Sequence, residues 1–266
     1  ITTEPMLIRN DFIKTRCYSQ EKSKSQKLVY EYVHYSFNSK KNISEYKNNE
    51  NKMNVMILVL DAVSLSSMKR ALPNTLNYLK SFENFFLFEK HHVTGENTFQ
   101  NLIPLLTNMN PEDLLKRKKI ELQKKVKNET KIIKIDPPFD EFPFLWKNFS
   151  QNGYVTYFSE EWKDSTFYNL KYGFKEQPTD YYLRPFWLAL YNSLSYAPTV
   201  LNSNPKPCYY NKLLHKISFD WLKSFEKFYS NLEDVHNIEN IPRFGLIILN
   251  EMSHDYLDRL FWIDND

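Results

Sequence analysis

Three apolar runs of this sequence each end in side chains that can bind a metal ion or take part in hydrolysis. The residues that follow the runs are Asp61 after 54–60, Glu160 and Glu161 after 154–158, and Glu251 with His254 after 244–249. A fourth reactive side chain, Thr98, opens a helical segment after a turn. In an open parallel sheet, ligands bind beyond the carboxyl ends of the strands, which is where these residues are expected to meet.

These residue types suit metal-assisted hydrolysis of a phosphate or sulfate ester. Asp61 offers a hard oxygen ligand, and Glu251 with His254 would hold a second ion, with zinc as the expected metal. Thr98 would act as the nucleophile, because a helix N-terminus favours an anionic group and a bound metal lowers the pKa of a hydroxyl. Two ions roughly 4 Å apart would hold the attacking and leaving oxygens of an in-line displacement.

Each of these residues also has a purely structural interpretation. Asp61 could cap the helix that follows it, and either Asn97 or Thr98 could cap the next one. The pair at 160–161 could be solvated loop acids, because charged residues are mostly exposed. His254 could be satisfied by a backbone group.

The elements that must position these residues alternate between strand and helix. The continuous apolar runs at 54–60 and 244–249 are typical of fully buried parallel strands. Further strands are expected at residues 30–37, 85–93, 131–136 and 154–158, and helices at 66–79, 99–106, 143–152 and 215–229. This alternation predicts an α/β fold, a doubly wound, mostly parallel sheet with helices on both faces.

The composition argues against several classes of function. The net charge of +3 gives no case for nucleic acid, and the four glycines form no phosphate-binding loop. No apolar run reaches membrane-spanning length. Residues 1–53 are polar and are interpreted as an N-terminal extension before a domain at 54–266. Cys17 and Cys208 could pair or stay free.

Four sequence blocks, in this order, resemble the DUF229 family of the alkaline-phosphatase-like, or sulfatase-like, superfamily. The blocks are residues 54–65 with 72–76, 94–107, 173–186 and 249–255. The resemblance covers nearly the whole chain from about Asn54. Arg184, in the third block, could meet an anionic substrate or be a buried structural residue.

The resemblance implies an alkaline-phosphatase-like fold in which Asp61 and Thr98 bind metal and Thr98 is the nucleophile. Glu251 and His254 match the acid and histidine of a later strand. Relatives often space these two residues four apart, and here they are three apart, which leaves Asn250 or Asp255 as alternatives for the acid.

The superfamily also has a later Asp-His-Gly segment and a further histidine, and neither is in this sequence. We therefore expect the chain to be the N-terminal part of the hydrolase domain, with its second metal site incomplete. The resemblance implies an extracellular or luminal protein acting on a small anionic ester or a glycan. Thr at position 98, rather than Cys or Ser, favours phosphate over sulfate. The alternative is a non-catalytic extracellular binding domain or an inactive remnant of the same fold.

Overall fold

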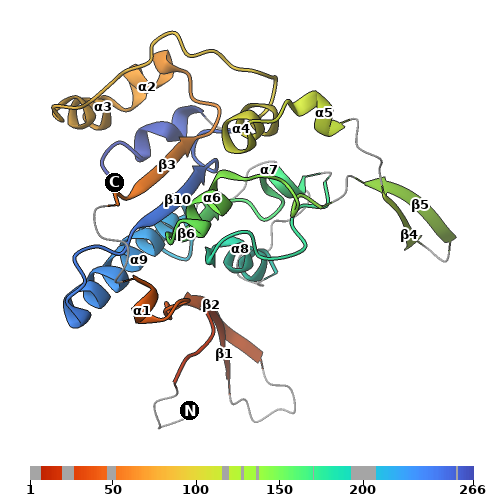
Figure 1. Cartoon of the computed structure of the whole chain (residues 1–266). Helices are drawn as coiled ribbons and strands as arrows, with labels where there is room; N and C mark the ends of the chain where they lie inside the picture. Colours follow the sequence, from red (N-terminus) through yellow and green to blue (C-terminus); the bar gives the residue numbers. More distant parts are fainter. Residues whose placement is uncertain are drawn as a thin grey trace.

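A four-stranded parallel sheet forms the centre of the protein in a computed structural model, which describes residues 7–19, 27–46, 52–115, 120–126, 129–135, 138–169, 171–192, 208–255 and 257–266. Its strands run in the order β3 (Val55–Leu60), β10 (Arg243–Leu249), β6 (Val155–Glu160) and β7 (Tyr181–Tyr182). The last strand in sequence thus lies between β3 and β6, in the middle of the sheet (Figure 1). This position brings the carboxyl end of β10 beside that of β3.

One face of the sheet is covered by α4 (Thr98–Thr107), α6 (Leu145–Gln151) and α7 (Ser165–Tyr168). Because successive strand residues point to opposite faces, Phe158 and Leu246 join this layer while their neighbours face away. A short helix, α5 (Pro111–Leu115), follows α4.

The opposite face is covered by α8 (Arg184–Tyr191) and by α9 (Leu214–His236), the longest helix of the described chain. Trp221 and Phe225 of α9 pack with Tyr157 and Ile247 of the sheet. A smaller core joins α2 (Leu65–Ala71) to the 3-10 helix η1 (Leu257–Trp262) beside α3 (Pro73–Lys80). The prediction of an α/β fold with helices on both faces of a parallel sheet is confirmed.

The N-terminal segment contains a hairpin, β1 (Phe12–Ser19) and β2 (Lys27–Tyr35), followed by α1 (Ile43–Tyr46). Its Val33 and Tyr46 are buried in the same core as α9. The assignment of 1–53 as a separate extension remains a prediction, but its described residues share the core of the domain.

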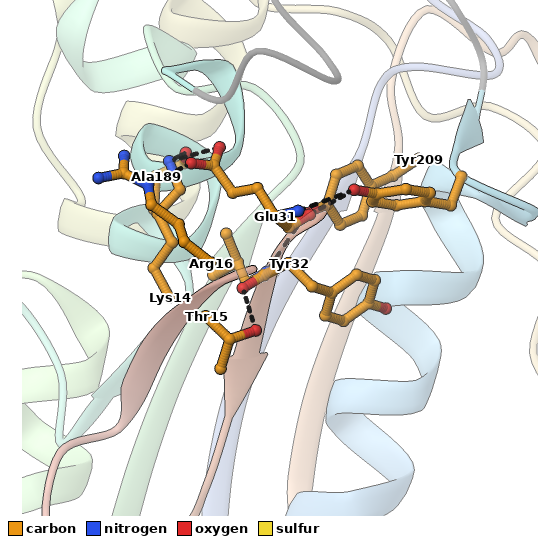
Figure 2. Close-up of polar contacts among 9 residues, drawn as sticks. Lys14, Thr15, Arg16, Glu31, Tyr32, Ala189 and Tyr209 are labelled. Carbon is orange, nitrogen blue, oxygen red and sulfur yellow. Dashed lines mark hydrogen bonds and ion pairs between the residues drawn. The ribbon is translucent and has the colours of Figure 1, made fainter. Parts of the chain in front are cut away.

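Ion pairs around a buried carboxylate join the two strands of this hairpin, and hydrogen bonds attach the hairpin to the domain. Figure 2 shows Glu31, only 3% exposed, with Lys14 at 3.0 Å and Arg16 at 2.5 Å from its two carboxylate oxygens. Lys14 also donates to the carbonyl of Ala189 in α8, at 3.1 Å. On the same strand, the Val33 N–H donates to the hydroxyl of Tyr209. The bond from Lys14 docks the hairpin against α8, and the bond from Val33 docks it against the segment that contains Tyr209.

Two further hairpins lie outside the central sheet. They are β4 (Ile120–Val126) with β5 (Glu129–Ile135), and β8 (Cys208–Tyr209) with β9 (Lys212–Leu213). The first projects from the body of the protein (Figure 1). Cys17 and Cys208 are both free. Within the described ranges, no helix combines the length and the apolar character needed to cross a membrane.

The strand expected at 85–93 is wrong. The described backbone there forms turns instead, with the Phe85 N–H donating to the Phe82 carbonyl and the His91 N–H to that of Phe88. Phe86 and Phe88 are exposed. Aromatic residues are common in strands, so the run resembles a strand in the sequence. A strand also needs a neighbouring strand to which its backbone groups can hydrogen-bond, and this segment pairs with none of the described strands.

Candidate functional site at the carboxyl ends of the strands

Asp61 is positioned by the end of β3. Its N–H donates to the carbonyl of Leu249 in β10, so the sheet ladder reaches this residue. Ala62 then takes a positive φ of 57°, and its N–H donates to Asp61 Oδ1 at 2.9 Å. The capping alternative for Asp61 does not hold, because the side chain of Ser64 accepts the capping bond of α2.

Thr98 is the first residue of α4 and its hydroxyl faces Asp61. Thr98 Oγ1 donates to the Asp61 carboxylate, at 3.0 Å from Oδ1 and 3.2 Å from Oδ2. The helix is capped by its neighbour Asn97, whose side chain accepts the N–H of Gln100. The Thr98 hydroxyl is therefore not used for capping, and it meets a carboxylate 37 positions away in sequence.

His254 lies in the segment that follows β10, the strand beside β3. Its Nδ1 donates to Asp255 at 2.7 Å, and its side chain is 57% exposed. Burial lowers the pKa of His254, but the hydrogen bond to Asp255 and the negative charge of Asp61 outweigh this, so the pKa is raised overall. The charge of Asp61 contributes to this shift, because β3 and β10 end side by side at the same edge of the sheet. The hydrogen-bond partner of the His254 ring is thus the carboxylate of Asp255, and not the backbone group that was the alternative from the sequence.

Glu251 is held differently. Its carboxylate accepts the hydroxyl of Tyr191 in α8 at 3.0 Å. Burial raises the pKa of Glu251, and the bond from Tyr191 partly opposes the shift. The charges of His254 and Asp255 also act on it, so it belongs to the same end of the sheet. Of the two possible substitutes, Asp255 pairs with His254, and the side-chain oxygen of Asn250 is buried with no hydrogen-bond partner among the described residues.

The interpretation of Glu160 and Glu161 as solvated loop acids is wrong, since both are buried. Glu160 accepts the N–H and hydroxyl of Thr166. Glu161 accepts the N–H groups of Asn250 and Glu251. In the sequence, both acids come directly after the apolar run 154–158, and this continuity could have indicated their burial. In the structure Glu160 ends β6, which is buried along its whole length, and Glu161 follows it.

Arg184 has structural contacts. Its guanidinium lies 3.4 Å from the ring centre of Tyr168 and donates to the carbonyl of Lys163. A cavity of about 200 Å³ lies away from the site. It is lined by Tyr32, His34 and Phe186, among others, and contains none of the predicted site residues.

The side chains at this edge of the sheet have the types of atoms that bind divalent metal ions. Carboxylate oxygen and imidazole nitrogen, from Asp61, Glu251 and His254, are the ligands that zinc takes. In the described parts of the chain, however, no three His, Cys, Asp or Glu side chains already converge as a cation site. The structure thus joins Asp61 to Thr98 by a hydrogen bond, whereas His254 pairs with Asp255 and Glu251 accepts from Tyr191.

Fold and site together define an α/β protein that pairs a helix-terminal threonine with a strand-terminal aspartate. The family described as "Protein of unknown function (DUF229)" matches residues 3–266, and the chain belongs to this family. The resemblance to DUF229 is therefore confirmed. No curated protein and no solved structure matches the chain.

Proposed function

We propose that this chain carries the nucleophile of a metal-dependent hydrolase of phosphate or sulfate esters, with an alkaline-phosphatase-like fold. The observation that supports the proposal is the hydrogen bond from Thr98 Oγ1 to Asp61. Two residues from distant parts of the chain meet at the edge of a parallel sheet where ligands bind. Neither is needed there as a helix cap, because Ser64 and Asn97 cap the helices.

In this mechanism Thr98 Oγ1 forms a bond to phosphorus or sulfur as the bond to the alcohol oxygen breaks, and the hydroxyl proton passes by way of Asp61 to the departing alcohol. Water then cleaves the ester on Thr98, which releases phosphate or sulfate and restores the hydroxyl. Asp61, which already accepts the hydroxyl proton, holds the attacking oxygen in place. The N-terminus of α4 attracts the anionic group through its backbone dipole. Asp61, Thr98, Glu251 and His254 would hold the metal, which when bound would lower the pKa of the hydroxyl.

Substrate and location follow from the same proposal. The substrate would be a small anionic ester, or a glycan that carries one. A threonine nucleophile favours phosphate, since sulfatases usually use a modified Cys or Ser. An extracellular or luminal location is part of this proposal.

The experiment compares turnover of p-nitrophenyl phosphate and p-nitrophenyl sulfate, in the presence of Zn²⁺, by the wild type, Thr98→Ala and Thr98→Ser. We expect Thr98→Ala to lose about 1,000-fold in rate, as when a nucleophile is removed, and Thr98→Ser to retain activity. Thr75→Ala is the matched control, because Thr75 lies in the first turn of α3 and bonds Asp264 through its backbone N–H. Equal rates for the wild type and Thr98→Ala would refute the role of Thr98.

A non-catalytic binding domain is the second candidate. The bond between Tyr191 and Glu251 favours it, because it occupies an expected metal ligand. A wild-type chain that neither binds Zn²⁺ nor turns over either ester would support this candidate.

A further inference from the structure

Glu161 is a buried carboxyl group that contacts the loop carrying two of the site residues. It follows directly after β6, and its exposed fraction is 0%. Its Oε2 accepts the N–H of Asn250 and the N–H of Glu251, both at 2.9 Å. Its Oε1 is buried and has no hydrogen-bond partner among the described residues.

The loop that it contacts begins where β10 ends. Residues 250–255 form a turn in which the N–H groups of Ser253 and His254 both donate to the carbonyl of Asn250. This turn carries Glu251 and His254. The first two N–H groups after the strand would otherwise be unpaired in a buried place, and such groups are costly.

Burying a carboxyl group to accept hydrogen bonds from two N–H groups is unfavourable in free energy. Removing a carboxyl from water costs several kcal/mol unless hydrogen bonds compensate. Both hydrogen bonds of Glu161 run to the loop, and none runs to another part of the described chain. The loop is thus what this side chain organises.

We propose that Glu161 is a positioning residue that holds the 250–255 loop, which carries Glu251 and His254, at the end of β10 beside the end of β3 that carries Asp61. The consequence for metal binding rests on the proposed function, whereas the effect on the loop does not. Residues behind metal ligands commonly act in this way, and their loss costs about 10–100-fold in metal affinity.

The first test measures hydrogen exchange of individual backbone amides in the full chain. We expect Glu161→Leu to lower the protection of the Asn250 and Glu251 amides about tenfold or more, while the amides of β6 and α4 keep theirs. Glu161→Gln keeps a carbonyl oxygen as acceptor and is expected to restore most of the protection. Glu161→Ala serves as the truncation if the leucine variant does not fold.

Glu160→Gln is the matched control, because Glu160 is also buried but bonds Thr166 instead of the loop. It is expected to leave the exchange of Asn250 and Glu251 unchanged. Unchanged protection of these two amides in the truncated variants would overturn the proposal. So would a loss spread evenly over the sheet, because that pattern indicates general destabilisation only.

The second test titrates the same variants with Co²⁺ alone and follows its visible absorption, which reports coordination. Weaker Co²⁺ binding by about 10–100-fold in the truncated variants, but not in Glu160→Gln, is the expected result. If the wild type binds no Co²⁺, the proposed hydrolase fails, while amide exchange still decides whether Glu161 holds the loop. If all variants bind Co²⁺ equally, Glu161 does not position the ligands.

Discussion

At the scale of single residues, the site depends on which side chains are not used to cap the neighbouring helices. Ser64 and Asn97 cap α2 and α4, and so Asp61 and Thr98 are available to bond each other. In the proposed hydrolase, this hydroxyl would meet the anionic ester at the N-terminus of α4, whose dipole favours negative charge. Replacing Thr98 or Glu161 therefore tests the site one side chain at a time.

Glu161 also predicts how stability depends on pH. Burial raises the pKa of Glu161 from 4.5 to about 8, although the N–H groups of Glu251 and Asn250 oppose the shift. Because the folded state holds the proton more tightly than the unfolded chain, the group contributes stability that is fully present below pH 4.5 and lost as the pH rises through about 8. The loss is on the order of a few kcal/mol.

Urea unfolding at mildly acidic and mildly alkaline pH measures this effect. The wild type is expected to lose more free energy of unfolding towards alkaline pH than Glu161→Gln, which has no proton to release. Comparing the two proteins cancels the other titrating groups. Parallel pH profiles for the two would show that Glu161 titrates normally.

At the scale of elements, the site depends on a tight contact between the two inner strands. Gly245 of β10 lies opposite Tyr157 of β6, and a Cβ on Gly245 would overlap the Tyr157 ring. That ring packs on Phe225 of α9, with ring centres 4.7 Å apart. The glycine therefore makes room for the aromatic layer between sheet and α9.

We predict that Gly245→Ala destabilises the fold by about 1–3 kcal/mol, because overpacking forces the ring or the strand to move. Thermal or urea unfolding measures the change. The double variant Tyr157→Leu/Gly245→Ala, compared with Tyr157→Leu, should show a much smaller effect of the added methyl group. An equal effect in both backgrounds would mean that the ring is not the obstacle.

At the scale of the whole molecule, β3 forms one of the two edges of the central sheet. Among the described strands, β3 pairs only with β10, and its Met56 and Leu58 are 53% and 45% exposed. A strand edge with exposed apolar side chains is prone to pair with another chain. This edge lies next to the end of β3 that carries Asp61.

We predict that the isolated chain self-associates through β3 and that Met56→Lys/Leu58→Lys weakens this association. Sedimentation velocity over a concentration series measures it. Val235→Lys is the matched control, because Val235 is an exposed apolar residue on α9 and not on β3. If the control weakens association as strongly as the β3 variant, or neither does, the edge is not responsible.

The sequence by itself determined the elements that carry the site. The apolar runs ending at Asp61 and before Asn250 predicted β3 and β10, and the turn before Thr98 predicted the start of α4. Such features are local, because periodicity, caps and breakers act within a few residues. Membership of DUF229 was likewise readable from ordered blocks of sequence.

Only the tertiary structure decided what lies opposite each of these residues. The insertion of β10 between β3 and β6 and the burial of Glu161 beneath the 250–255 loop depend on contacts between distant segments. The segment 85–93 had the composition of a strand but found no partner in the described sheet. Strand pairing and desolvation are set by the surroundings that folding creates, and local pattern does not contain them.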